Sequence, residues 1–338
     1  MPKLTKKIIF IYLLILVALY LVIAVIPSLT GALTRTEVIE YGELKVSDKV
    51  KCYIVRDETV YAASENGTMK FSAEEGQQVK RGTKVLAFTE ESNISKNTKS
   101  KDKTENSSKY EGIVDSLGDS IVPDSSYVSQ RKGTFSFYID GYENYFTPKN
   151  MKSLSQTKIS EMTTQPKNVK RKTAVKGDPI YKISDNSKWY IACWIEETDV
   201  SKYEIGNSVT VELPKGDVKA TINNIIEDGN QWLLILKTNR YYEGYTNIRE
   251  AEGSLVTTDQ EGLLISNRCI TTKKNKVGVY VKNTSGDYNF KPIQALATDG
   301  KKTLVSEGTY YNDKGESVDT VEGYDEVLKN PDSDKEGK

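Results

Sequence analysis

One long apolar run stands apart from the rest of the chain. Residues 8–26, which begin with Ile8 and end with Ile26, contain no charged side chain. A helix of this length is about what is needed to cross the hydrocarbon core of a membrane. Three lysines precede the run, whereas the first basic residue after it is Arg35. This pattern predicts a single transmembrane helix, a cytoplasmic amino terminus and an extracytoplasmic location for the bulk of the chain.

A cleaved secretory signal is the alternative interpretation of the same run. The apolar part of a signal peptide is usually shorter and is followed by small residues at a cleavage site. Here the run is long, and its exit at residues 25–32, VIPSLTGA, offers only a poor site. An uncleaved anchor is therefore favoured.

Short apolar runs separated by glycines characterise residues 67–89, which read GTMKFSAEEGQQVKRGTKVLAFT. The runs at residues 69–71 and 85–88 are typical of short strands, and Gly76 and Gly82 between them suit tight turns. This stretch therefore predicts two short strands joined by a connection with a turn at each glycine.

A second stretch, far along the chain, repeats the same cadence. Residues 175–183, VKGDPIYKI, follow the order of residues 79–87, VKRGTKVLA: valine, basic residue, glycine, two further residues and then an apolar strand. Gly177 takes the place of Gly82 in this comparison. Two such halves predict one domain that is split in the sequence.

The sequence from residue 189 onward is rich in strand-forming residues. Residues 189–195, WYIACWI, and 209–213, VTVEL, read as strands, and Asp228-Gly-Asn230 reads as the turn of a hairpin. Residues 232–236, WLLIL, are continuously apolar, which predicts a buried strand. A small β-barrel is expected here.

The repeated cadence, the intervening FSFYIDGYE at residues 135–143 and the order of the downstream strands resemble HlyD-type membrane fusion proteins, also called periplasmic adaptors. In that family two half-motifs pair into one lipoyl-like barrel-sandwich domain; here they would be residues 61–90 and 133–184. The resemblance is to relatives from Gram-positive bacteria. It implies a mainly β fold, with a transmembrane helix followed by a split lipoyl-like barrel-sandwich, a β-barrel and a membrane-proximal β region.

The resemblance and the local composition together predict the order of segments along the chain. The first three segments are a cytoplasmic stub at 1–7, the transmembrane helix at 8–26 and a connection at 27–50. The split domain follows, with the first strand of the membrane-proximal region and the first lipoyl-like half at 51–90, a polar linker at 91–132, and the second half with a short helical insertion at 133–184. The last segments are the β-barrel at 185–261, the membrane-proximal β region at 262–312 and an acidic disordered tail at 313–338. The structural turns of the lipoyl-like halves are assigned to Gly76, Gly82, Gly141 and Gly177.

The predicted linker replaces an element of the family. In many efflux adaptors a long helical hairpin separates the two halves and engages an outer-membrane channel. Residues 95–109, SKNTKSKDKTENSSK, contain no apolar side chain, and no sustained apolar repeat occurs between residues 90 and 133. The missing hairpin implies a protein with no outer-membrane channel to meet.

A short helix is predicted to open at Thr147-Pro148, since threonine suits the cap and proline the first turn. Met151, Leu154, Ile159 and Met162 would lie roughly on one side of it, and the helix would pack over the barrel-sandwich.

Composition restricts the chemistry. The 47 basic and 47 acidic side chains give a formal net charge of zero, so no global field draws the chain to nucleic acid, and partners must be recognised by local surfaces. Histidine is absent, which removes the commonest general base and metal ligand. Cys52, Cys193 and Cys269 are far apart and read as small buried hydrophobes. One disulfide with a thiol left over stays open as an alternative.

No catalytic, metal or cofactor residue is predicted. Met69-Lys70 invites comparison with a lipoyl or biotinyl lysine, but Lys70 lies inside a strand and away from the turn, so a solvated lysine is expected. Asp140-Gly-Tyr-Glu143 is the best candidate for a special polar site, although a plain turn is favoured.

The abundant tyrosines suggest one further contact surface. Tyr241, Tyr242 and Tyr245 would form an exposed aromatic patch, or else serve at a strand edge.

The resemblance implies an adaptor subunit that binds an export or efflux transporter, with an ABC-type permease as the expected partner, and that assembles into a homo-oligomer without catalysis. Its contact surfaces would be the anchor helix, the membrane-proximal region and the turns around Gly76 and Gly82. The alternative is a structural cell-envelope or cell-division factor built from the same modules. An enzyme acting on wall polymer is a weaker third hypothesis, because no catalytic constellation is present.

Overall fold

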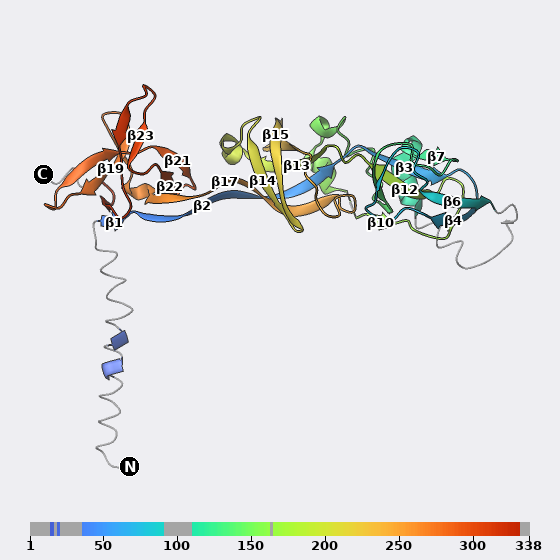
Figure 1. Cartoon of the computed structure of the whole chain (residues 1–338), viewed down its shortest axis with the longest axis horizontal. Coiled ribbons are helices and arrows are strands. Elements are labelled where there is room, and N and C mark those ends of the chain that lie inside the picture. Colours follow the sequence, from blue (N-terminus) through green and yellow to red (C-terminus); the bar gives the residue numbers. More distant parts are fainter. Residues whose placement is uncertain (1–13, 17–18, 21–35, 91–109, 163–164, 332–338) are drawn as a thin grey trace, which may run out of the picture. The chain divides into compact units, whose positions relative to one another are not determined.

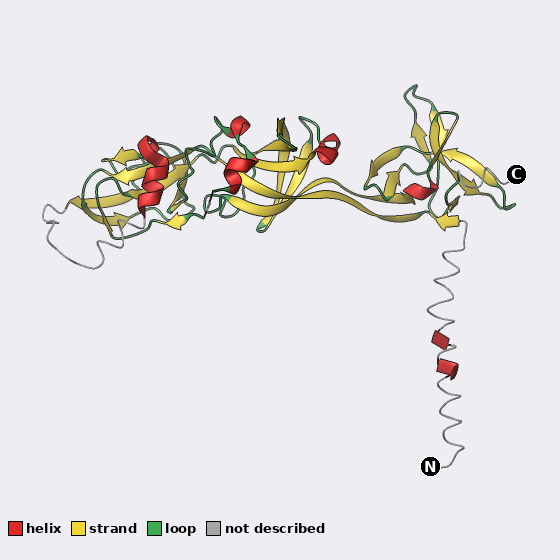
Figure 2. Cartoon of the chain, turned by 180° about the vertical axis from the view of Figure 1, so that it is seen from behind, coloured by secondary structure: helices red, strands yellow, loops and turns green. Residues whose placement is uncertain are grey.

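The computed structural model describes residues 14–16, 19–20, 36–90, 110–162 and 165–331. Strands dominate it, and the helices among the described residues are short (Figures 1 and 2). The chain forms two compact units: unit 1 comprises Met1–Val46 and Thr258–Lys338, and unit 2 comprises Ser47–Thr257. The predicted mainly β fold class is confirmed.

The predicted membrane anchor is not part of this description. Ile8 and Ile26 lie outside the described residues. Within the ranges that are described, no helix has both the length and the apolar character required to cross a bilayer.

The first part of unit 2 is a barrel-sandwich made from two distant stretches of chain. Strand β3 (Glu58–Ala63) pairs with β12 (Pro179–Ser184), and β4 (Gly67–Phe71) pairs with β11 (Thr173–Ala174). Both pairings are antiparallel, and β3 and β12 lie side by side in Figure 1. The predicted split domain is therefore confirmed.

Two small sheets enclose the core of this barrel-sandwich. Their strand orders are β5-β8-β12-β3-β7 and β11-β4-β6. The core is aromatic, with Tyr181 stacked between Tyr61 and Phe135 at centroid distances of 4.9 and 5.1 Å. The remaining elements are β5 (Gln78–Val79), β6 (Leu86–Glu90), β7 (Val122–Asp124), β8 (Gly133–Ser136), β9 (Tyr138–Ile139) and β10 (Lys167–Asn168).

Residues 110–132 are part of this domain, so the prediction of a polar linker over 91–132 is wrong for them. Residues 110–117 are helical, η2 (Gly118–Ser120) follows, and β7 adds to β3 as a parallel strand. Tyr110, Ile113 and Leu117 are spaced by three and four residues and are buried in one cluster. The apolar stripe is short, but it is enough to pack in one cluster with Val60 of β3 and Ile139 of β9. Residues 91–109 lie outside the described residues.

The second part of unit 2 is a β-barrel. Its sheet runs in the order β14-β15-β16-β13-β2-β17, and β14 also pairs with β17, which closes it. The strands are β2 (Glu40–Val55), β13 (Trp189–Glu196), β14 (Ser208–Leu213), β15 (Gly216–Asp228), β16 (Gln231–Thr238) and β17 (Glu250–Ser266), with η4 (Glu197–Lys202) between β13 and β14.

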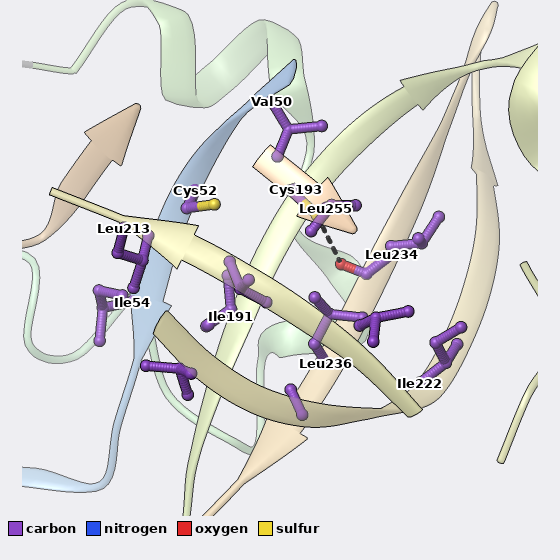
Figure 3. Packing of buried hydrophobic residues seen from close by; sticks show 14 of the residues in the cluster. Val50, Cys52, Ile54, Ile191, Cys193, Leu213, Ile222, Leu234, Leu236 and Leu255 are labelled. Atoms are coloured by element: carbon purple, nitrogen blue, oxygen red, sulfur yellow. Dashed lines mark hydrogen bonds between the residues drawn. The ribbon is translucent and has the colours of Figure 1, made fainter. Parts of the chain in front are cut away.

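Alternate residues of these strands fill the interior of the barrel (Figure 3). Ile54, Ile191, Leu234 and Leu236 are fully buried there, and the Cys193 thiol lies 4.0 Å from the Leu234 carbonyl oxygen. Burial of residues 233–236 confirms the predicted core strand. All three cysteines are buried and free, which confirms their interpretation as small hydrophobes.

The helical insertion packs on the outer face of the barrel, so the prediction that one helix covers the barrel-sandwich is wrong. It consists of η3 (Met151–Ser153) and α4 (Gln156–Ser160), separated by Leu154 and Ser155, whose backbones are extended. Its apolar residues contact Tyr190, Leu233 and Ile235. Strands β13 and β16 are apolar on both faces, and a strand of that kind needs a cover on its second side.

Unit 1 is also built of strands, some of which lie in segments predicted otherwise. β1 (Thr36–Val38) and the start of β2 lie in the predicted connection 27–50. The other elements are η5 (Asn267–Cys269), β18 (Thr271–Lys273), β19 (Lys276–Lys282), β20 (Tyr288–Pro292), β21 (Ala295–Thr298), β22 (Lys302–Val305), β23 (Thr309–Tyr311), β24 (Ser317–Asp319) and β25 (Glu326–Leu328).

The acidic segment after residue 312 is folded up to residue 331, which corrects the prediction of a disordered tail over 313–338. β25 lies between β1 and β19, and Val327 is opposite both Glu37 and Val281. Val321 and Val327 are buried in the core of unit 1. A few apolar side chains in register with a sheet outweigh the acidic composition here.

Val327→Ala should destabilise unit 1 by about 2 kcal/mol, because it removes two methyl groups from a packed core and leaves a small cavity. The matched control is Val277→Ala on β19, where the side chain is 47% exposed and the expected loss is below about 0.5 kcal/mol. Urea unfolding of the two variants measures both values. Equal effects would show that β25 contributes nothing to this core.

Candidate functional site

Six charged side chains lie buried together in unit 2, and we call them the ionic cluster. The side chains of Arg56, Glu58, Lys182 and Arg249 are fully buried, and at least 98% of the Glu143 side chain is hidden from solvent. The members are Arg56, Glu58, Asp140, Glu143, Lys182 and Arg249. Three cations therefore face three carboxylates without access to water.

Glu58 is the centre of the cluster because three cations converge on it. Lys182 Nζ lies 2.8 Å from its Oε1 and Arg56 Nε lies 3.1 Å from the same oxygen. Arg249 Nη2 donates to its other oxygen, Oε2, at 2.6 Å. Both carboxylate oxygens are thus engaged by charged partners.

The turn after β9 supplies the other two carboxylates. Arg249 Nε donates to Asp140 Oδ2 at 2.6 Å. Glu143 accepts the backbone N–H groups of Asp140 and Gly141 at 3.0 Å each, and Lys182 Nζ donates to it at 3.2 Å. Gly141 has a φ of +87°, which this turn requires and which a residue with a Cβ rarely adopts.

The cluster joins the two parts of unit 2. Glu58 begins β3 and Lys182 lies in β12, so both belong to the barrel-sandwich. Arg249 immediately precedes β17 of the barrel, and its Nη1 donates to the Ile54 carbonyl oxygen of β2 at 2.9 Å. Arg56, next to the end of β2, donates to the Ile248 carbonyl oxygen at 3.0 Å. Side chains anchored in the barrel therefore pair with carboxylates of the sandwich.

Burial and pairing move the pKa values of the cluster in opposite directions. Burial alone would raise the pKa of Glu58, but Arg249, Arg56 and Lys182 lower it well below its usual value. Burial would also raise the pKa of Asp140, and Arg249 and Lys182 lower it. Burial raises the pKa of Glu143, and Lys182 only partly offsets this because the Asp140 and Glu58 carboxylates add to the rise.

The cluster has the chemistry of a structural junction. Its carboxylates are buried and paired with cations. Burying an ion cluster costs desolvation free energy, and the attraction between its charges roughly offsets that cost. Removing one member destabilises the fold, because it leaves an uncompensated buried charge. The arrangement therefore favours one relative placement of barrel-sandwich and barrel over others.

Sequence reasoning found part of this site. Asp140 and Glu143 were singled out, and they do form a turn, but that turn is also the polar site. Arg56, Glu58, Lys182 and Arg249 were missed. A signal was present in Ile180-Tyr-Lys-Ile183, where a lysine interrupts a buried apolar strand.

The four predicted turn glycines occupy turns in which φ is positive. Gly76, Gly82 and Gly177 have values of +76°, +85° and +90°. Their N–H groups donate to the carbonyl oxygens of Phe135, Ser129 and Ala63 respectively. Gly141 alone among the four contributes to the ionic cluster.

A cleft of about 450 Å³ lies between the turn around Gly76 and the loop at residues 239–247. Tyr242 and Tyr245 line it but are buried, with exposures of 4% and 7%, while Tyr241 is 80% exposed. The predicted aromatic patch is therefore wrong for two of its three members. Their rings pack on Trp189 at centroid distances of 6.4 and 5.8 Å.

Two further observations concern cofactors and metals. Lys70 is exposed on β4, as expected of a solvated lysine. In the part of the chain that the structure describes, no group of three or more cysteine, aspartate or glutamate side chains is arranged to hold a metal ion.

The fold and its junction define a class of β protein in which a split barrel-sandwich is followed by a β-barrel. Sequence matches give this class a family. Residues 58–185 match the RND-related barrel-sandwich hybrid domain, and residues 189–259 match the RND-related β-barrel domain. The two matches together cover more than half of the chain. The chain therefore carries both RND-related domains in this order, which confirms the resemblance to membrane fusion proteins, or periplasmic adaptors, seen in the sequence.

The solved structures that match this chain are remote from it in sequence. MacA from Actinobacillus actinomycetemcomitans is 18% identical, with a TM-score of 0.34 over 86% of this chain and 98% of that chain. ZneB from Cupriavidus metallidurans is 11% identical, with a TM-score of 0.29, and the match covers 87% of this chain and 91% of that chain. The membrane fusion protein Spr0693 from Streptococcus pneumoniae R6 is 8% identical, with a TM-score of 0.28, and the match covers 64% of this chain and 98% of that chain. No curated protein matches the sequence significantly. The family assignment rests on the two sequence matches.

Glu58→Gln should lower the free energy of unfolding by about 3–5 kcal/mol at pH 7, because it leaves the buried cations undercompensated. The folded-state pKa of Glu58 is below its unfolded value of about 4.3, so its stabilisation is present above that pH and is lost as the pH falls through the folded pKa. The gap between wild type and variant should therefore narrow as the pH drops from 5 to 3.

Urea unfolding at several pH values measures this gap. The control Glu74→Gln, at an exposed position, should change stability by less than about 0.5 kcal/mol. A gap that stays constant across the pH range would contradict the assigned ion pairs.

Proposed function

We propose that this protein is a membrane-anchored, extracytoplasmic adaptor subunit of an export or efflux transporter, and that it works as a scaffold without catalysis. The observation that carries the proposal is the family membership: a split barrel-sandwich at residues 58–185 followed by the RND-related β-barrel at 189–259. The transporter we propose is an ABC-type permease, and the adaptor would act as a homo-oligomer.

The ionic cluster suits a scaffold. An adaptor must hold its domains at a defined orientation while its ends contact different partners. Buried pairs between the barrel residue Arg249 and the sandwich residues Glu58 and Asp140 supply such rigidity at one junction. The proposed anchor is the apolar run from Ile8 to Ile26, with the amino terminus in the cytoplasm.

Thiol labelling of whole cells tests the proposed location. Tyr241→Cys places a cysteine at an 80% exposed position. The native thiols give little background because they are buried, and burial raises the pKa of Cys52 to about 12 and that of Cys269 to about 11. A membrane-impermeant maleimide should label the variant, but not the wild type, in intact cells. Labelling that requires permeabilised cells would contradict an extracytoplasmic location.

Photo-crosslinking tests the proposed partner. A photoreactive residue at Leu296 or Tyr311 of unit 1, which are 55% and 73% exposed, should capture a membrane permease in living cells. The matched control carries the same group at exposed Lys158 of α4 and should capture much less of it. Capture of cell-division or wall-assembly proteins instead would favour the structural alternative and overturn the transporter proposal.

A further inference from the structure

The outer surface of the β-barrel carries a hollow of about 790 Å³ that is lined by cations. Lys188, Lys219, Lys237 and Arg240 all border it, and all four are exposed. None of the residues that line it is an aspartate or a glutamate. We call this surface the basic hollow. It is separate from the ionic cluster, and it shares Asn239 and Arg240 with the lining of the cleft near Gly76.

Strand register explains why these cations gather on the outside. Lys219 lies on β15 between the buried residues Val218 and Ala220, and Lys237 lies on β16 between buried Leu236 and Thr238. Alternation along each strand therefore points both lysines away from the barrel interior.

The helical insertion stops short of these positions. It packs on Leu233 and Ile235 of β16, on the same face as Lys237, which follows Ile235 by two residues and is left exposed. Lys237 is opposite Thr221 on β15 and Tyr190 on β13. The outer face thus changes from a covered apolar surface to an open basic one along a single strand.

The charges of the basic hollow are not balanced by ion pairs within the described part of the chain. Some exposed lysines elsewhere are paired, as Lys202 is with Asp48 and Lys282 is with Glu326. Among the residues that the structure describes, no ion pair involves any of the four cations of the basic hollow. Asp185 is close enough to Lys188 to feel its charge, but the Asp185 carboxylate accepts a hydrogen bond from the Ser187 N–H.

Gathering like charges without counterions costs free energy unless a partner supplies the opposite charge. The whole chain has zero formal net charge, so this excess is local. Hydroxyl and amide groups complete the lining, and they can donate further hydrogen bonds to an acceptor-rich ligand. They belong to Ser187, Ser208, Thr221, Asn223 and Asn239.

We propose that the basic hollow binds a phosphate-bearing polyanion. Phosphate groups carry the negative charge that would balance the four cations, and their oxygens can accept hydrogen bonds from the surrounding donors. A guanidinium such as that of Arg240 can bind a phosphate through two parallel hydrogen bonds. An acidic protein surface would also bring apolar side chains to bury, and the exposed apolar lining is limited to Ile205. This binding is independent of the transporter proposal and goes beyond it.

Fluorescence anisotropy with labelled long-chain inorganic polyphosphate tests the proposal on the full-length protein in a neutral detergent. Lys219→Gln/Lys237→Gln should weaken binding at least tenfold at low salt. If each lysine contacts one phosphate, the slope of log affinity against log salt should become shallower by about 1.5. The matched control Lys152→Gln/Lys158→Gln removes the same charge from exposed positions of the helical insertion and should change affinity less than twofold.

Three outcomes would overturn the proposal. One is the absence of polyphosphate binding by the wild type, and another is an equal loss in the control variant, which would indicate a general charge effect. The third is tighter binding of poly-glutamate than of polyphosphate, which would point to an acidic protein instead. Circular dichroism of both double variants should match that of the wild type, since all four positions are exposed. If only Lys219→Gln/Lys237→Gln lost its native spectrum, the polyphosphate affinity of the single variant Arg240→Gln would decide the proposal instead.

Discussion

The convergence of three buried cations on Glu58 is the interaction on which the architecture of unit 2 depends. Arg56 and Arg249 reach the carboxylates from the β-barrel, while Glu58 and Lys182 come from adjacent strands of the barrel-sandwich. Each charge would be costly in this environment without its partners, so the cluster forms only when both parts of unit 2 take their places together. Apolar burial drives the collapse of each part, and the ion pairs select their relative orientation.

The need to bury apolar strand faces explains the rest of unit 2. Strands β13 and β16 are apolar on both faces, so the barrel interior takes one side and the helical insertion takes the other. That insertion comes from the sandwich segment between β9 and β10, and it therefore ties the two parts at a second place. Where the insertion ends, the outer face becomes polar and basic. The boundary between Ile235 and Lys237 is at once the limit of the hydrophobic contact and the start of the basic hollow.

The split barrel-sandwich, the barrel strands and the buried cysteines were predictable because each follows from a local pattern or a repeated cadence. Gly76, Gly82 and Gly177 occupy turns of positive φ, as such spacings suggest. The ionic cluster was not predictable in the same way. A lone Arg249 or Glu58 in a polar stretch looks solvated, and only the tertiary pairing between residues about 190 positions apart buries it. The fold of residues 313–331 was missed for a similar reason, since Val321 and Val327 are buried only by contacts with distant segments of the chain.

A double-mutant cycle of Glu58→Gln and Arg249→Gln, followed by urea unfolding at pH 7, tests most directly whether the buried pairs fix the barrel on the sandwich. If the two side chains act as one unit, the double variant should be more stable than the sum of the single losses predicts, with a coupling free energy of about 1–3 kcal/mol. Losses that add to within about 0.5 kcal/mol would show that the two side chains act independently, and the account of unit 2 as one body held by this cluster would be wrong.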